Sequence, residues 1–431
     1  MLDRRGRRQW AMLVPAALVL AGLAGCGGSR PSGHAVITVS PATAVLDVPV
    51  TVRLTGLPAD AGITVAAAAT DGRGVVWRSA AVYRSDAAGQ LGLDQAPVSG
   101  SYTGRNPMGL FQFMKPPASA PLDDVRLFPS AGGLTVRLTA SAAGRQLAEA
   151  VAVRQPPQAA GVTERRYRPG PDGIYADLYL PAHPAGRHPA VLVFGGSEGG
   201  ISDDLNAALL ASHGYPAMAL AYFAEPGLPQ ALVNIPLEYF AKALTVLRAV
   251  PGVDPGHVLV SGASRGGEAA LLLGSYFPNL VDGVIAGVPS SVVIPGDVPG
   301  SQPAWRLGGR PLPYVSVHDF GNPNPADAQQ AVIPVERIRG PLLLDCGILD
   351  RVWPSCSYLD AITSRLSAHH FEYPVTPVKL DGGHFVANPL RYYSATDPNF
   401  ANGGGDASSD EPAQAEVYGK VLDLLASVTR H

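Results

Sequence analysis

The chain has 431 residues, of which 46% are hydrophobic and 16% are charged, and its formal net charge is −3. This length is sufficient for two domains and a large core. Basic residues do not cluster after the N-terminus, which argues against nucleic acid as a partner. No later apolar stretch approaches the ~18 residues of a membrane-spanning helix.

The first 26 residues have the features of a bacterial export signal. Four arginines precede the apolar run 10–23, which is too short to span a membrane, and Leu-Ala-Gly-Cys follows at 23–26. We therefore expect a lipoprotein-type signal peptide over 1–26, with lipidated Cys26 anchoring the protein to the outer face of the cytoplasmic membrane. Simple cleavage nearby, giving a secreted or periplasmic protein, and a retained anchor remain alternatives. Removal of residues 1–25 takes away four arginines and one aspartate, which lowers the net charge to about −6.

Residues 27–34 are rich in glycine and serine and predict a short flexible tether. Residues 35–155 contain short runs that alternate apolar and polar side chains, separated by Gly, Pro and Asp. This pattern predicts an N-terminal β-sandwich domain of immunoglobulin-like type. The runs are 36–39, 50–54, 63–65, 75–77 and 134–138.

Gln-Pro-Pro-Gln at 155–158 is the natural linker to a second domain. From residue 161 to 431, strand-like runs alternate with helical runs, which predicts a parallel sheet. The helical stripes within 237–247 and 417–428 are expected to be ordinary core packing. The low-complexity segment 402–410 is interpreted as a disordered insert rather than as part of a pocket wall.

A glycine-rich loop, Gly-Gly-Ser-Glu-Gly-Gly at 195–200, follows the strand-like run 190–194. Its glycines allow a backbone N–H of Ser197 or Gly196 to face a substrate oxygen that becomes negative during acyl transfer. An ordinary βα turn is the alternative interpretation. The loop is not a phosphate loop, because no Gly-Lys-Ser/Thr follows.

The most informative motif is Gly-x-Ser-x-Gly at 262–266, which stands between a β-branched apolar run and an Ala/Leu-rich helical run. This is the setting of a nucleophile elbow, in which Gly262 and Gly266 permit a sharp turn. Ser264 is therefore the candidate nucleophile. The backbone amide of Arg265, at the start of the helix, is a candidate donor to the oxyanion.

A serine nucleophile needs a histidine base and an acid that orients it, in the chain order Ser, acid, His. Asp350 follows the buried run 340–347, and His384 follows the strand-like run 377–380, so both are expected at the carboxyl edge of the sheet. A turn aspartate and a loop histidine are the alternative interpretations. Other acids and bases downstream of the serine suit the two roles less well: Asp345, Asp360, Asp381, His369 and His370.

Cys346 and Cys356 flank Asp350. In an oxidising compartment the two cysteines could form a disulfide that restrains the loop of Asp350. Two buried free thiols are an alternative that the sequence supports equally.

Three segments besides the elbow resemble the family of acyl-CoA thioesterases and bile acid-CoA:amino acid N-acyltransferases. They are Ser-Tyr-Thr-Gly-Arg-Asn-Pro-Met-Gly-Leu at 101–110, the glycine-rich loop at 195–200, and Asp350 with Trp-Pro-Ser at 353–355. The resemblance implies an N-terminal β-sandwich, a C-terminal α/β-hydrolase domain, and a triad of Ser264, Asp350 and His384. The N-acyltransferases of the family use cysteine as nucleophile, so a serine favours the thioesterase branch and water as acceptor.

The expected activity is hydrolysis of acyl thioesters through an acyl-enzyme, without metal or cofactor. Acyl-CoA is intracellular, whereas the leader predicts export. A hydrolase of exported carboxylic esters and an acyltransferase to an amine or alcohol are therefore kept as alternatives, as is a binding protein on an inactive hydrolase scaffold. The expected partner is a small acyl thioester or ester, with membrane contact only through the lipidated N-terminus.

Overall fold

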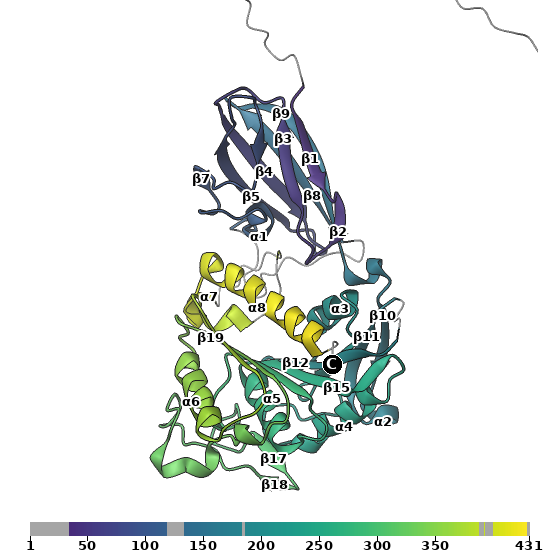
Figure 1. Cartoon of the computed structure of the whole chain (residues 1–431), viewed down its shortest axis with the longest axis vertical. Helices are drawn as coiled ribbons and strands as arrows, with labels where there is room; N and C mark the ends of the chain where they lie inside the picture. The colour runs from purple at the N-terminus through teal and green to yellow at the C-terminus, as the bar shows by residue number, and fades with distance from the viewer. Residues whose placement is uncertain (1–33, 119–132, 183–185, 388–391, 393–399, 429–431) are drawn as a thin grey trace, which may run out of the picture. The chain divides into compact units, whose positions relative to one another are not determined.

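The computed structural model describes residues 34–118, 133–182, 186–387, 392 and 400–428 (Figure 1). The predicted signal peptide, most of the tether and Cys26 lie outside the described residues, so lipidation stays a prediction. Within the described ranges, no helix combines the length and the apolar character needed to cross a membrane.

The N-terminal region consists of β-strands in two sheets. One sheet has the order β1-β3-β6 and the other has the order β2-β9-β8-β4-β5-β7. The sequence alternation places one face of each strand in a common core that includes Val52, Val65, Trp77 and Leu138. The elements are β1 (Val36–Ser40), β2 (Thr43–Val45), β3 (Thr51–Thr55), β4 (Gly62–Thr70), β5 (Val76–Arg84), β6 (Leu91–Gly92), β7 (Ser99–Gly100), α1 (Gly109–Gln112), β8 (Leu134–Ala142) and β9 (Arg145–Gln155).

The second region is built on an eight-stranded sheet of order β10-β11-β13-β12-β15-β16-β19-β20. The first three strands of this order pair antiparallel and all later pairs are parallel. The strands are β10 (Thr163–Tyr167), β11 (Tyr175–Leu180), β12 (His188–Phe194), β13 (Ala217–Ala221), β15 (Val253–Ala263), β16 (Gly283–Gly287), β19 (Leu342–Gly347) and β20 (Val375–Leu380).

Helices cover both faces of this sheet (Figure 1). The α-helices are α2 (Pro169–Asp172), α3 (Asp204–Ser212), α4 (Leu237–Arg248), α5 (Arg265–Tyr276), α6 (Ser355–Ala368), α7 (Phe400–Gly403) and α8 (Ala407–Val428). Short 3-10 turns are η1 (Pro157–Ala160), η2 (Ala326–Ala331), η3 (Val335–Arg337) and η4 (His384–Ala387). A small side sheet has the order β14 (Ile235–Pro236), β17 (Trp305–Leu307), β18 (Arg310–Pro311). The predicted fold class, an α/β-hydrolase domain after a β-sandwich, is confirmed.

The central strands bury alternate residues against different helices. In β15, Val258 and Val260 belong to the core under α4, α5 and α6, whereas Leu259 belongs to the core under α3 and α8. The same alternation assigns Ile285 of β16 and Leu343 of β19 to the α3/α8 side. Because side chains two residues apart share a face, Ser261 and Asp345 also project toward that side.

The interpretation of 402–410 as a disordered insert was wrong. This segment forms the end of α7 and the beginning of α8, and the Asp410 carboxylate accepts a 2.7 Å hydrogen bond from the backbone of Gly383. Asp410 is fully buried. A composition typical of loops is therefore overridden by a tertiary hydrogen bond that no local pattern reveals.

An aromatic cluster fills the core on the α4/α5 side. Phe240 of α4 is fully buried, and its ring lies 5.1 Å from Phe194 and 5.0 Å from Tyr222 between centroids. Such contacts cannot be replaced when the ring is removed, because the surrounding backbone relaxes only partly.

We predict that Phe240→Ala lowers the free energy of unfolding by about 3–5 kcal/mol. Urea unfolding followed by tryptophan fluorescence measures this loss. Phe320→Ala is the matched control, because Phe320 is 44% exposed, and it should cost much less. Equal losses for the two variants would contradict the core assignment.

Candidate active site

Ser264 stands on a strained turn between β15 and α5. Its backbone has φ 59° and ψ −121°, a combination that residues other than glycine rarely adopt. A Cβ on Gly262 would meet the carbonyl oxygen of Gly266 at 2.5 Å, and a Cβ on Gly266 would meet that of Gly195 at 2.5 Å. Both glycines of the motif are therefore required by close backbone contact.

The three residues proposed as a triad lie in hydrogen-bond contact. His384 Nε2 is 2.9 Å from Ser264 Oγ, and His384 Nδ1 is 2.8 Å from Asp350 Oδ2. The side chains of His384 and Asp350 are 8% and 1% exposed. This is the arrangement of nucleophile, base and orienting acid that acyl transfer by a serine requires.

The acid is fixed by its own loop. Asp350 Oδ1 accepts the backbone N–H groups of Val352 and Trp353 at 2.9 and 3.2 Å, which leaves Oδ2 for the imidazole. The Trp353 ring packs edge-on against His384, with centroids 5.3 Å apart, and its Nε1 donates to the Val288 carbonyl at 3.0 Å. Asp350 and His384 are thus held from several directions.

The rival residues lie elsewhere. Asp360 forms an exposed ion pair with Lys379, and Asp381 is exposed. His369 and His370 are exposed at the end of α6. Asp345 is buried in β19 and is not the partner of His384.

The C-terminal segment supports both loops. Besides the contact of Asp410 with the histidine loop, the Arg351 backbone N–H donates to the Gly403 carbonyl at 3.1 Å, and Gln414 Nε2 donates to the Phe385 carbonyl at 2.9 Å. Cys346 and Cys356 form a disulfide bond with Cα atoms 5.0 Å apart, which closes the loop around Asp350.

Of the candidate oxyanion donors, Gly196 is engaged elsewhere. Its N–H donates to the Glu198 carboxylate, 3.0 Å from each oxygen. Within the part of the chain that the structure describes, the N–H groups of Ser197 and Arg265 have no protein acceptor. These two amides are the ones available to a substrate oxygen.

Tyr222 orients the peptide that carries the Ser197 amide. The buried Tyr222 hydroxyl donates to the carbonyl oxygens of Gly195 and Gly196 at 3.0 and 2.7 Å. In a trans peptide the carbonyl and the next N–H point in opposite directions, so holding the Gly196 carbonyl directs the Ser197 N–H away from Tyr222. Burial raises the pKa of Tyr222 well above its usual range, so it remains a hydrogen-bond donor.

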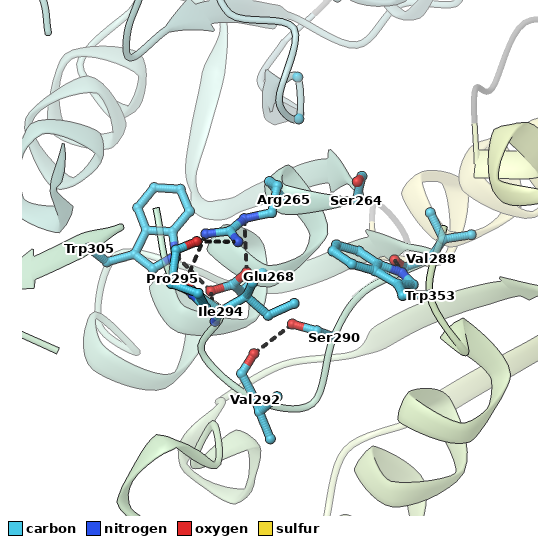
Figure 2. Close-up of polar contacts among 12 residues, drawn as sticks. Ser264, Arg265, Glu268, Val288, Ser290, Val292, Ile294, Pro295, Trp305 and Trp353 are labelled. Carbon is cyan, nitrogen blue, oxygen red and sulfur yellow. Dashed lines mark hydrogen bonds and ion pairs between the residues drawn. The ribbon is translucent and has the colours of Figure 1, made fainter. Parts of the chain in front are cut away.

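The side chain of Arg265 points away from Ser264 (Figure 2). Its guanidinium donates to the carbonyls of Pro295 and Ile294 at 2.9 and 3.1 Å, and Nε lies 3.2 Å from the Glu268 carboxylate without hydrogen-bond geometry. Glu268 Oε1 accepts the indole N–H of Trp305 at 2.7 Å and the backbone N–H of Ile294 at 3.1 Å. Burial raises the pKa of Glu268, and Arg265 opposes that rise.

A cavity of about 430 Å³ opens beside the nucleophile. Ser264, His384 and the Gly195–Glu198 part of the glycine-rich loop line it, together with side chains of α3, α8 and the ends of β15, β16 and β19. The described residues contain no group of three or more His, Cys, Asp or Glu side chains arranged to hold a metal ion.

Sequence reasoning missed Tyr222, Glu198, Glu268 and Asp410. Two of them carry a signal in hindsight. Tyr222 directly follows the apolar strand β13 at the carboxyl edge, and Glu268 is the one acid in the Ala- and Leu-rich helix α5, three residues after Arg265. The other two depend on tertiary contacts.

Two family models match the chain. The Acyl-CoA thioester hydrolase/BAAT N-terminal region matches residues 47–166, and the BAAT / Acyl-CoA thioester hydrolase C terminal matches 235–298 and 312–429. Among solved structures, a putative dienelactone hydrolase from Klebsiella pneumoniae subsp. pneumoniae MGH 78578 is 17% identical with a TM-score of 0.43. It covers 62% of this chain and 98% of that chain, and the score is too low to add to the fold assignment.

Curated relatives cover most of the chain. Acyl-coenzyme A thioesterase 1 of Rattus norvegicus is 31% identical over 386 residues, which span 83% of this chain and 86% of the relative. Acyl-coenzyme A thioesterase 6 of Mus musculus is 29% identical over 412 residues, spanning 90% and 95%. The chain is therefore a hydrolytic enzyme that belongs to the family of acyl-CoA thioester hydrolases and bile acid-CoA:amino acid N-acyltransferases.

Proposed function

We propose that this protein hydrolyses acyl thioesters of the acyl-CoA type with Ser264 as nucleophile, His384 as general base and acid, and Asp350 as the acid that orients the imidazole. The relatives named as acyl-coenzyme A thioesterases support the thioester as substrate. The single observation that carries the catalytic roles is the continuous hydrogen-bond chain from Asp350 through His384 to Ser264.

In the first half-reaction, His384 Nε2 takes the hydroxyl proton as Ser264 Oγ attacks the acyl carbon. The carbonyl oxygen becomes negative and is held by the N–H groups of Ser197 and Arg265. Collapse breaks the carbon–sulfur bond, and the leaving thiolate receives the proton from His384. Water then attacks the acyl-enzyme with His384 as base, and the acid and the free serine are released.

Hydrolysis of carboxylic esters is the second candidate. The leader that predicts export favours it, because coenzyme A thioesters are intracellular. The same triad serves both reactions, since only the leaving group differs. Transfer to an amine or alcohol would replace water in the second step, and the serine nucleophile argues for water.

We predict that Ser264→Ala lowers kcat by about 10⁴-fold or more in a folded protein. The assay is a panel of acyl-CoAs and simple esters with matched acyl groups, run on protein that lacks residues 1–25. Higher kcat/KM for the CoA compounds supports the thioesterase, and higher values for the esters select the second candidate. Retention of a tenth of wild-type activity by the variant would refute Ser264 as nucleophile.

We predict that Asp350→Asn is severely impaired but folded, whereas Asp381→Asn is close to wild type. The asparagine can still accept the backbone N–H groups of Val352 and Trp353, but its amide does not stabilise the imidazolium. Steady-state kinetics of both variants on one substrate measure this contrast. The reverse ranking would show that the acid is misassigned.

We predict that Tyr222→Phe lowers kcat by about tenfold or more with little change in KM, because the Ser197 amide loses its orientation while Ser264 and the cavity stay in place. Tyr239→Phe is the matched control. Its hydroxyl donates to the Ala221 carbonyl at 2.8 Å and does not touch the glycine-rich loop. Equal effects of the two variants on kcat would refute this role.

A further inference from the structure

The cavity beside Ser264 has two kinds of wall. Ile285, Val417 and Val421 are apolar. The lining also includes polar side chains that the catalytic steps do not use, among them Ser202, Asn206, Ser261 and Asp345. A site for a plain hydrocarbon chain would not need polar groups of this kind, since burying them without partners costs free energy.

Asn206 is the clearest of these groups. It lies in the first turn of α3 and is 6% exposed. Its Oδ1 is buried without a hydrogen-bond partner among the described residues. The neighbouring Ser202 Oγ is also buried without a partner among the described residues. A buried primary amide offers one acceptor and two donors.

Asp345, near the C-terminal end of β19, adds a buried side-chain carboxyl group to the cavity wall. It is 1% exposed, and Oδ1 accepts a long hydrogen bond, 3.3 Å, from the Val288 backbone. Oδ2 lies beside Gly287, since a Cβ built there would be 3.2 Å from it. Burial raises the pKa of Asp345 to about 7, so near neutral pH a large part of it is protonated and can donate.

These groups share one face of the sheet. The alternation in β15, β16 and β19 directs Ser261, Ile285 and Asp345 to the α3/α8 side, where Asn206 enters from α3. The register sets Ser261 opposite Ile285 and Asp345 opposite Gly287, so the polar and apolar groups belong to one continuous floor. The cavity volume, about 430 Å³, is that of a site for a small ligand.

We propose that this cavity binds the acyl part of the substrate and selects acyl groups that carry a hydroxyl or keto oxygen on their chain. The inference rests on the proposed function, because Ser264 defines where the acyl carbon lies. A hydroxyl can donate to Asn206 Oδ1 and accept from the Asn206 amide or from Ser202, while the hydrocarbon part contacts Val417 and Val421. A carboxylate in the same position is disfavoured by the carboxylate of Glu198 in the loop.

The test compares acyl groups that differ by one oxygen. Hexanoyl, 3-hydroxyhexanoyl, 6-hydroxyhexanoyl and adipoyl compounds are assayed as CoA thioesters and as simple esters with one common alcohol. The wild type should prefer at least one hydroxylated acyl group over hexanoyl by about tenfold or more in kcat/KM, since a site with buried polar groups discriminates against an analogue that leaves them unpaired. Preference for hexanoyl or adipoyl would overturn the proposal.

Three variants locate the preference. Asn206→Leu, which keeps the side-chain volume, should bring the hydroxyl-to-hexanoyl ratio of kcat/KM close to one, because the group that pairs with the substrate hydroxyl is removed. Asp345→Asn keeps the acceptor for Val288 and a permanent donor, so it should retain the ratio. Asn279→Leu is the control, because Asn279 is exposed and outside the cavity. An unchanged ratio in Asn206→Leu would overturn the assignment.

Binding separates this inference from the proposed function. Calorimetry on Ser264→Ala should give the same order of affinity, hydroxylated above plain acyl, without any turnover. If the wild type and Ser264→Ala hydrolyse the substrates equally fast, the proposed triad is refuted. The order of binding affinities still tests the proposal that the cavity selects oxygenated acyl groups. If Ser264→Ala is inactive but binds hydroxylated and plain acyl compounds with equal affinity, only the proposed selectivity of the cavity is refuted.

Discussion

The active site depends on the close approach of two backbone turns. The elbow after β15 and the glycine-rich loop after β12 come so near that a single added Cβ on Gly266 would collide with the Gly195 carbonyl. This contact places the turn that carries Arg265 next to the loop that carries Ser197, although the two residues are 68 positions apart in the chain. Backbone donors that are already in place when an oxyanion forms stabilise it without any reorganisation of the protein during the reaction.

The two turns are held in place by hydrogen bonds from buried polar groups on the side away from Ser264. Tyr222 holds two carbonyls of the glycine-rich loop, and the Arg265–Glu268 pair links the first turn of the nucleophile helix to the strand-connecting segment 290–296 and to Trp305 (Figure 2). A buried ion pair is a weak source of stability, because desolvation offsets most of the attraction. Here the pair fixes geometry, because its hydrogen bonds hold the first turn of α5 directly after the strained backbone of Ser264.

The elements of the site that follow from local patterns could be predicted from the sequence. The elbow is a contiguous strand, turn and helix, and Asp350 and His384 both follow strand ends in the expected order. The choice between Gly196 and Ser197 could not be predicted, because the hydroxyl of Tyr222, just after β13, and the carboxylate of Glu198 decide which amide is engaged. The helical start of α8 was missed for the same reason, since Asp410 is stabilised by a distant loop. Asp345 was noticed only as a rival acid, because its place on the α3/α8 face needs the sheet register.

The hydrogen bonds from α7 and α8 to the acid and histidine loops have a consequence for biosynthesis. Ser264, Asp350 and His384 leave the ribosome well before Asp410 and Gln414, which buttress the loop that carries the imidazole. Val417 and Val421, which line the cavity beside Ser264, come later still. The loop that carries His384 therefore gains these two hydrogen bonds only after the start of α8 has been synthesised, so the site described here is complete only when translation is nearly finished.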